Sequence, residues 1–295
     1  MTIPRIPSLS KNKQKLLNQI VDELSKIEGI AALVLGGSHA SGTAHEGSDM
    51  DIGLYYDDKS PFRIAEIKRV AEKISLSGSV SVTDFYGWGA WVNGGAWIHT
   101  AEGKVDFIYR NLEQVNQTLD DADRGIWQHD YQQQPAYGFY SVTYLAETKI
   151  CIPLFDPAGI IMALKERVAV YPPKLKQSII ADSLWSVEFT LSHAREFASQ
   201  GDVFNAVGCL TRASASLSQA LFALNETYYL REKKSFNVID HFSIRPEGYT
   251  TQVAAILAHP GSNAVELEQS VETMTSVWQS VISLPGVDYT PKFVL

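Results

Sequence analysis

A pair of glycines at the end of an apolar run constrains the N-terminal part of this chain. Residues 30–35 are apolar and end at Gly36 and Gly37, with Ser38 next. The run predicts a buried strand, and glycines at its end let backbone amides approach an anion closely. Because Ser38 adds a hydroxyl donor, the turn is a candidate phosphate cradle.

Two aspartates follow this turn after a gap of about ten residues. Asp49 and Asp51 precede residues 52–56, which are rich in strand-forming side chains. Side chains at i and i+2 of a strand point to the same face, so the two carboxylates can share a cation or a cation pair. A P-loop is excluded because no Lys-Ser or Lys-Thr follows Gly37, and the glycine spacing does not fit a dinucleotide fingerprint.

The Gly-Gly-Ser and Asp-x-Asp motifs together resemble the signature of the DNA polymerase β-like nucleotidyltransferase superfamily. In that superfamily a third carboxylate comes from a later strand. Asp106, within the alternating run 103–109, matches this position. A carboxylate among apolar neighbours is costly unless it is paired or binds a metal. A salt bridge to Lys104 or Arg110 is the alternative interpretation of Asp106.

The resemblance implies transfer of a nucleoside monophosphate to a hydroxyl, with release of pyrophosphate. The nucleotide-binding residues that it implies are Gly36, Gly37 and Ser38. The catalytic and metal-binding residues that it implies are Asp49, Asp51 and Asp106, with two Mg²⁺ ions and Mn²⁺ as an alternative. Asp106 would also accept the proton of the attacking hydroxyl.

Periodicity around the motif predicts helices over 10–27 and 61–76 and strands over 79–85 and 150–154. A glycine- and tryptophan-rich run over 86–100 is interpreted as a packed loop between two strands. One of its tryptophans remains a candidate pocket wall; they are Trp88, Trp91 and Trp97.

The second half of the chain has helical periodicity over 174–200, 203–224 and roughly 250–284. Asp202 is the expected N-cap of the second of these helices. An earlier helix over 160–170 stops before two prolines, and the domain boundary is expected close to this region. The expected fold class is α+β: a small mixed-sheet nucleotidyltransferase domain over 1–157, followed by an all-α helical-bundle domain over 158–295.

This two-domain arrangement resembles the aminoglycoside and lincosamide nucleotidyltransferases, in which a helical domain closes the cleft over the acceptor. A cation from that domain would complete the triphosphate site, and Lys233 and Arg212 are the candidates. The alternative for either residue is a cation that stabilises a helix C-terminus.

The charge balance limits the class of acceptor. The net charge is −8, and the densest basic cluster, at 231–234, contains an acidic residue. A protein that grips a polynucleotide needs a basic surface, so no nucleic-acid partner is expected. The expected partners are a nucleoside triphosphate, with ATP favoured, and a small-molecule hydroxyl acceptor.

The remaining expectations concern location and assembly. No apolar run has transmembrane length, so neither a membrane span nor a membrane partner is expected. Cys151 and Cys209 are expected to be reduced thiols, consistent with a cytoplasmic protein. A homodimer is a further expectation. Two other functional classes stay open: a non-catalytic nucleotide-binding or antitoxin-like module, and an enzyme that adenylylates proteins.

Overall fold

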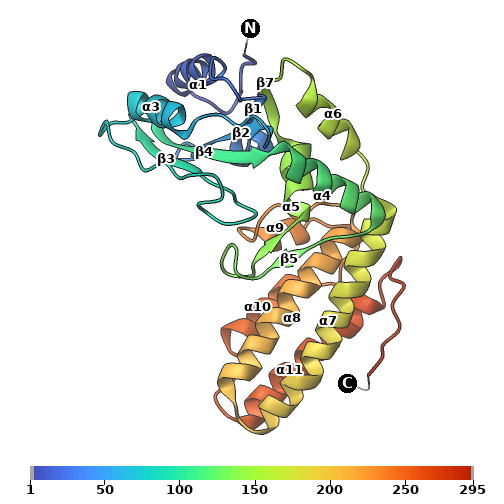
Figure 1. The fold of residues 1–295 in the computed structure, drawn as a ribbon. Coiled ribbons are helices and arrows are strands. Elements are labelled where there is room, and N and C mark those ends of the chain that lie inside the picture. Colours follow the sequence, from blue (N-terminus) through green and yellow to red (C-terminus); the bar gives the residue numbers. More distant parts are fainter. Residues whose placement is uncertain (1–2, 294–295) are drawn as a thin grey trace. The chain divides into compact units, whose positions relative to one another are not determined.

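The protein is described here from a computed structural model, which covers residues 3–293 and divides into two compact units (Figure 1). The first unit runs to Asp120 and resumes over Tyr144–Val170, while the second comprises Asp121–Thr143 and the chain from Tyr171 onward. This division differs from the expected ranges 1–157 and 158–295 in two places. The segment Asp121–Thr143 belongs to the second unit, and the helix after residue 157 stays with the first.

The first unit is built on a five-stranded mixed sheet in the order β3-β4-β2-β1-β7. Its strands are β1 (Ala32–Leu35), β2 (Met50–Tyr56), β3 (Gly95–Thr100), β4 (Gly103–Asn111) and β7 (Ile152–Phe155). The pair β2 and β4 is parallel, and the other three pairs are antiparallel. The expected α+β class is confirmed.

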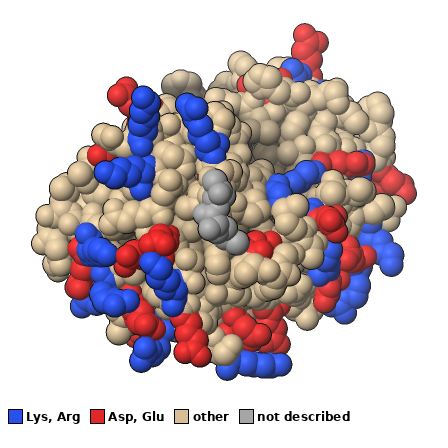
Figure 2. All heavy atoms as spheres, turned by 90° about the horizontal axis from the view of Figure 1, so that it is seen from above, with Lys and Arg blue, Asp and Glu red and all other residues tan. Residues whose placement is uncertain are grey.

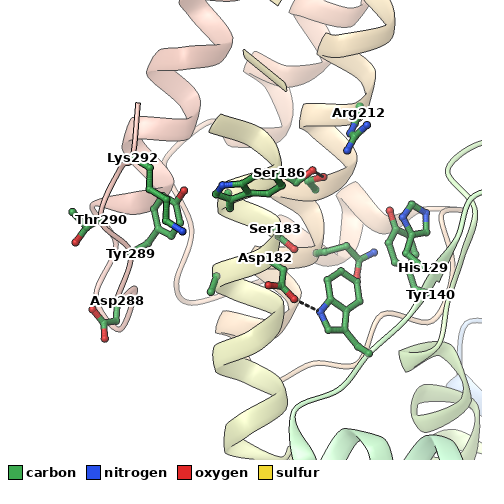
Figure 3. A pocket seen from close by; sticks show the side chains of 15 residues that line it. His129, Tyr140, Asp182, Ser183, Ser186, Arg212, Asp288, Tyr289, Thr290 and Lys292 are labelled. Carbon is green, nitrogen blue, oxygen red and sulfur yellow. Dashed lines mark hydrogen bonds between the residues drawn. The ribbon is translucent and has the colours of Figure 1, made fainter. Parts of the chain in front are cut away.

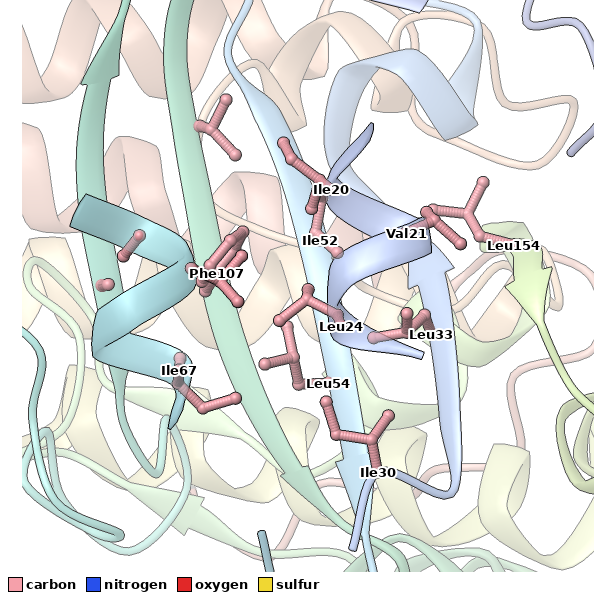
Figure 4. Close-up of a cluster of buried hydrophobic side chains, with 14 of the residues drawn as sticks. Ile20, Val21, Leu24, Ile30, Leu33, Ile52, Leu54, Ile67, Phe107 and Leu154 are labelled. Carbon is pink, nitrogen blue, oxygen red and sulfur yellow. The ribbon is translucent and has the colours of Figure 1, made fainter. Parts of the chain in front are cut away.

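Six helices accompany this sheet along the chain, and two of them form its core layer. They are α1 (Lys11–Leu24), α2 (Gly37–Ser41), α3 (Ile64–Ile74), α4 (Leu112–Arg124), α5 (Val142–Ile150) and α6 (Ile160–Arg167). Figure 4 shows α1 and α3 packed on one face of the sheet, with Ile20, Ile52 and Phe107 among the buried side chains. Because strand side chains alternate between faces, the neighbours of these core residues point to the opposite face. That opposite face carries Asp51 and Asp106.

The strand expected over 79–85 is wrong. Within that segment Val82 forms one isolated bridge to Ala96, and the edge strand next to β4 is β3, inside the tryptophan-rich run. The reason is that Thr83 bonds Gly95 through its side chain as well as its backbone. The amide of Gly95 donates to Oγ1 of Thr83 at 2.9 Å, and the amide of Thr83 donates to the carbonyl of Gly95 at 3.0 Å. The ladder therefore does not extend through this segment.

The second unit is helical apart from a small hairpin. Its helices are α7 (Pro173–Ser199), α8 (Val203–Leu224), α9 (Ser235–Ile239), α10 (Tyr249–Ala258) and α11 (Ala264–Ile282), and its strands are β5 (His129–Asp130) and β6 (Phe139–Tyr140). Asp202 caps α8 as expected, accepting from the amide of Asn205. The single helix expected over 250–284 is two helices, because Pro260 and Gly261 interrupt it. Asn263 then caps α11.

Basic and acidic side chains are interspersed on the face shown in Figure 2 rather than gathered into a basic stripe. None of the helices within residues 3–293 is both long enough and apolar enough to span a membrane.

Candidate active site

Three side chains on neighbouring strands and the glycine turn after β1 form a row across one face of the first unit's sheet. In the parallel ladder Asp51 on β2 pairs with Asp106 on β4, and in the antiparallel ladder Asp106 pairs with Trp97 on β3. On the other side the amide of Gly36, just after β1, donates to the carbonyl of Asp51 at 2.8 Å. Paired residues of neighbouring strands project from the same face of a sheet. The glycine turn, two carboxylates and a tryptophan therefore follow one another in that order.

Gly37 is required by the site for two independent reasons. Its φ is +58°, a left-handed conformation that side chains disfavour. A Cβ added there would lie 1.6 Å from Oδ2 of Asp51, an impossible contact. Gly36 is different, because a Cβ at that position would lie 3.8 Å from the Cβ of Asp51. The second glycine thus lets the turn lie directly against the Asp51 carboxylate, with Ser38 next in the chain.

The loop that leads to Asp49 is tied to α1 by a lysine. Nζ of Lys13 donates to the carbonyls of Glu46 and Ser48 at 3.1 and 2.9 Å. The Ser48 hydroxyl in turn accepts from the amide of His45 at 2.9 Å. These bonds fix the backbone immediately before Asp49, which holds that carboxylate at the start of β2.

His39, in the short helix after the glycine turn, is buried, and Oγ of Ser8 lies 2.9 Å from its Nδ1. Burial lowers the pKa of His39, and the positive charge of Lys13 acts in the same direction. The contact with Ser8 joins the short helix after the glycine turn to the segment that precedes α1.

The carboxylate of Asp106 is electrostatically coupled to both earlier aspartates. Burial, followed by the negative charges of Asp51 and Asp49, raises the pKa of Asp106 to about 6, while Lys104 acts in the opposite direction. A salt bridge to Arg110 does not account for Asp106, because Arg110 forms a bidentate pair with Glu147, with both N–O distances 2.8 Å. The three carboxylates therefore concentrate negative charge at one edge of the sheet.

A divalent cation suits such a group of carboxylates. Carboxylate oxygens are the hard ligands that Mg²⁺ prefers. The register places Asp51 beside Asp106 on one face, and their mutual repulsion is the charge that a bound cation would neutralise. As placed, no three His, Cys, Asp or Glu side chains within residues 3–293 converge closely enough to hold an ion together. The donor chemistry and register fit Mg²⁺.

The two basic residues expected to reach the triphosphate belong to the second unit, whereas the three carboxylates belong to the first. Lys233 is exposed in the turn before α9. Arg212 is exposed on α8, where it lines a cavity of about 760 Å³ together with Tyr140 and Ser183 (Figure 3). Their role in nucleotide binding stays a prediction.

Sequence reasoning missed Lys13 and the strand that carries Trp97. Lys13 gives no local signal, because its role depends on a loop more than thirty residues away. Trp97 is among the expected pocket candidates, but the run that contains it is interpreted from the sequence as a loop, whereas Gly95–Thr100 forms the edge strand β3. Trp91 packs as expected, with its ring 5.7 Å from that of Tyr144.

Comparison with known families agrees with the fold and the motif. Residues 17–85 match the family model described as a nucleotidyltransferase domain. This match supports the resemblance to the DNA polymerase β-like nucleotidyltransferase superfamily that the glycine turn and the paired aspartates predict. The match includes Asp49 and Asp51 and ends before Asp106.

Residues 141–233 match a second family model, described as a domain of unknown function (DUF4037). This match extends across parts of both units. Among solved structures, the chain is similar to a nucleotidyltransferase-like protein from Exiguobacterium sibiricum 255-15, with 9% identity and a TM-score of 0.46. The similarity covers 92% of this chain and 76% of that one. No curated protein matches the chain.

Proposed function

We propose that the protein is a Mg²⁺-dependent nucleotidyltransferase that moves a nucleoside monophosphate from a nucleoside triphosphate to the hydroxyl of a small molecule, releasing pyrophosphate. The observation that carries this proposal is the pairing of Asp51 with Asp106 beside a glycine turn that only glycine can form. A glycine turn next to two or three carboxylates suits a triphosphate with its cation: backbone amides of such a turn bind phosphate oxygens, and the acids bind the cation.

Each residue of the row has a separate task in this reaction. Gly37 and Ser38 bind the terminal phosphates, so that the leaving pyrophosphate departs on the β1 side of the site. Asp49 and Asp51 would hold Mg²⁺, and Asp106 would complete the metal site. Mg²⁺, when bound, neutralises the phosphate oxygens and lowers the pKa of the acceptor hydroxyl. Asp106 takes the proton of that hydroxyl.

The overall charge supports a small acceptor rather than a polynucleotide. The chain carries a net charge of −8, to which the three carboxylates of the site contribute, whereas a protein that binds a phosphodiester backbone needs a basic surface. We therefore place the acceptor among neutral or cationic hydroxyl compounds. ATP is the favoured donor, and the reaction needs no nucleic acid.

Calorimetric titration with ATP, GTP, CTP and UTP, each with Mg²⁺, tests this function directly. The wild type should bind at least one triphosphate only when Mg²⁺ is present, and Asp51→Asn should lose both this binding and nucleotide transfer. Asp57→Asn is a matched control, because Asp57 lies just beyond the other end of β2 and is exposed. Transfer by Asp51→Asn at the wild-type rate would refute the proposal.

The acceptor class can be separated from protein adenylylation by mass spectrometry. Incubation with MgATP and a mixture of small alcohols should give a mass increase of one nucleotide on an alcohol. A second incubation contains MgATP and a cell extract. The same mass increase appearing on a protein of that extract, and on no alcohol, would assign the chain to protein modification. A protein that binds nucleotide with no transfer to either class would be a binding module.

A further inference from the structure

The row across the sheet begins at the glycine turn after β1 and ends at an exposed tryptophan on β3. Trp97 lies on the edge strand β3, opposite Asp106, and its side chain is 66% exposed. It therefore projects from the same face as the two carboxylates, one strand spacing beyond Asp106, or about 5 Å. An exposed indole next to two carboxylates offers a flat apolar face on which a ring of a bound molecule can stack.

Trp97 is held in place by a second tryptophan. The rings of Trp88 and Trp97 are stacked, with centroids 4.8 Å apart and planes inclined by 19°. Trp88 itself lies against the sheet at Gly95, where an added Cβ would come within 2.9 Å of its ring. The two stacked indoles are therefore an ordered part of the structure beside β3: the ring of Trp88 packs against the sheet, and the ring of Trp97 is exposed.

The loop that supplies Trp88 is also fixed by buried hydrogen bonds. Asn93 is fully buried, accepts from the amide of Tyr86 at 2.9 Å and donates to the hydroxyl of Tyr56 at 2.7 Å. The amide of Trp88 donates to the carbonyl of Asn93 at 2.8 Å. Since these contacts order the loop before any ligand arrives, little conformational entropy remains to be lost when a molecule stacks on Trp97.

The geometry of phosphoryl transfer indicates whether the nucleoside triphosphate or the acceptor lies next to Trp97. In an in-line displacement the attacking oxygen and the leaving group lie on opposite sides of the phosphorus. The glycine turn that binds the leaving pyrophosphate is at the β1 end of the row, and Asp106 and Trp97 are at the β3 end. The attacking hydroxyl therefore enters from the side of Trp97.

We propose that Trp97 is the specificity-determining residue for the acceptor, and that the acceptor is a hydroxyl compound whose ring stacks on the exposed indole. This inference rests on the proposed function, because it takes the direction of attack from it. The ring can be aromatic or the apolar face of a saturated polyhydroxylated ring, since both stack on an indole through the same flat contact. An open-chain alcohol offers no such face.

The first test is a binding measurement that does not depend on turnover. The chain has six tryptophans. With 5-fluorotryptophan incorporated, each gives a ¹⁹F resonance that can be assigned by single Trp→Phe variants. Benzyl alcohol and inositol are the ring probes, and sorbitol is the open-chain control that matches inositol in hydroxyl groups. In the presence of MgATP a ring probe should shift the Trp97 resonance, whereas sorbitol should not.

Trp185 provides the matched control, because it is also exposed and stacked, on Phe189 of α7, but belongs to the second unit. Its resonance should not move with either ring probe. If neither ring probe moves the Trp97 signal, or sorbitol moves it equally, the proposal is overturned.

The second test separates specificity from chemistry. For transfer to the ring probe that binds, Trp97→Ala should raise KM about tenfold with little change in kcat, Trp97→Phe should restore most of the affinity, and Trp185→Ala should match the wild type. The Kd for ATP should be unchanged in all three variants. A changed Kd for ATP with unchanged acceptor KM would place the nucleobase, rather than the acceptor, on Trp97 and overturn the proposal.

Different results would refute the proposed transferase function and the proposed role of Trp97. A Trp97 resonance that shifts with ring probes while no alcohol is ever nucleotidylated would leave the stacking surface standing and refute the transferase. Nucleotidylation of sorbitol as efficient as that of inositol, unaffected by Trp97→Ala, would leave the transferase standing and refute the role of Trp97.

Discussion

Asp51 on β2 and Asp106 on β4 are directly paired in the one parallel ladder of the five-stranded sheet. Residues 55 positions apart in the chain are thereby placed on the same face at the spacing of adjacent strands. The pairing explains the raised pKa of Asp106, because Asp51 is the largest charge acting on it after burial itself. The position of the Asp51 carboxylate also explains why residue 37 must be glycine, because any side chain there would enter the space of that carboxylate.

Substitution of the second glycine of the turn should inactivate the protein through Asp51. We expect Gly37→Ala to abolish Mg²⁺-dependent nucleotide binding, because the new Cβ would occupy the position of the Asp51 carboxylate. Gly42→Ala is the matched control. Gly42 has a similar φ of +73° with open space around it, so that variant should lose only about 1 kcal/mol of unfolding free energy and keep binding. Calorimetry and urea unfolding measure both effects.

Gly36→Ala completes this series. Its Cβ would lie at ordinary contact distance from Asp51, so binding should be retained. Equal loss of binding in all three glycine variants would show that flexibility of the turn, rather than space beside Asp51, is what the site requires.

The raised pKa of Asp106 predicts a pH-dependent stability in the absence of metal. Its folded-state pKa of about 6 lies above the ordinary value of 3.8, so folding favours the protonated acid. The resulting stabilisation is complete below about pH 4 and is lost as the pH rises through about 6. In EDTA, the Tm of the wild type relative to Asp106→Asn should therefore be higher at about pH 4.5 than at about pH 7. A pH-independent difference in Tm would contradict the electrostatic coupling of the three acids.

Bound Mg²⁺ should reverse this dependence. Because protons and the cation compete for the same carboxylates, added Mg²⁺ should raise the Tm of the wild type more at about pH 7 than at about pH 5. Asp106→Asn should show a smaller Mg²⁺ effect with a weaker dependence on pH. This measurement needs no substrate, so it tests the cation site separately from transfer.

The motif and the helical half of the fold could be predicted from the sequence because their signals are local. The glycine turn, the strand after Asp51 and the cap at Asp202 are each defined by residues close in the chain, and helical periodicity located α7 and α8 to within a residue or two. The interruption between α10 and α11 also has a local sequence signal, Pro260 followed by Gly261, which the prediction of a single helix overlooked.

Strand pairing could not be predicted in the same way, because it depends on contacts distant in the chain. The segment 79–85 and β3 both alternate, and only the pairing with β4 decides which of them continues the sheet. The same limit applies to Trp97. Its position opposite Asp106 follows from the register of the β3–β4 hairpin, so its relation to the site became visible only in the folded chain.

The ion pair between Arg110 and Glu147 should contribute strongly to the stability of the first unit. Arg110 is buried, bonds Glu147 through two nitrogens, and lies with its guanidinium carbon 5.3 Å from the ring centre of Tyr144. Glu147→Gln would leave the arginine buried with its charge unpaired, and we expect a loss of about 3 kcal/mol of unfolding free energy. The double variant Arg110→Met, Glu147→Leu should lose less than Glu147→Gln alone, as measured by urea unfolding. Equal losses in the two would mean that packing, not charge, dominates.

The C-terminal tail of the second unit should depend on a single buried carboxylate. Glu188 on α7 is fully buried and accepts hydrogen bonds from the hydroxyl of Tyr289 and the amides of Lys292 and Phe293. Tyr289→Phe removes one donor to a buried charge and should cost about 2 kcal/mol of unfolding free energy, whereas Tyr131→Phe, at an exposed tyrosine, should cost almost nothing. Because the other two donors are backbone amides of the tail, Glu188→Ala should also release it, seen as faster proteolytic cleavage after residue 283. A tail that stays protected in Glu188→Ala would show that its apolar contacts alone hold it.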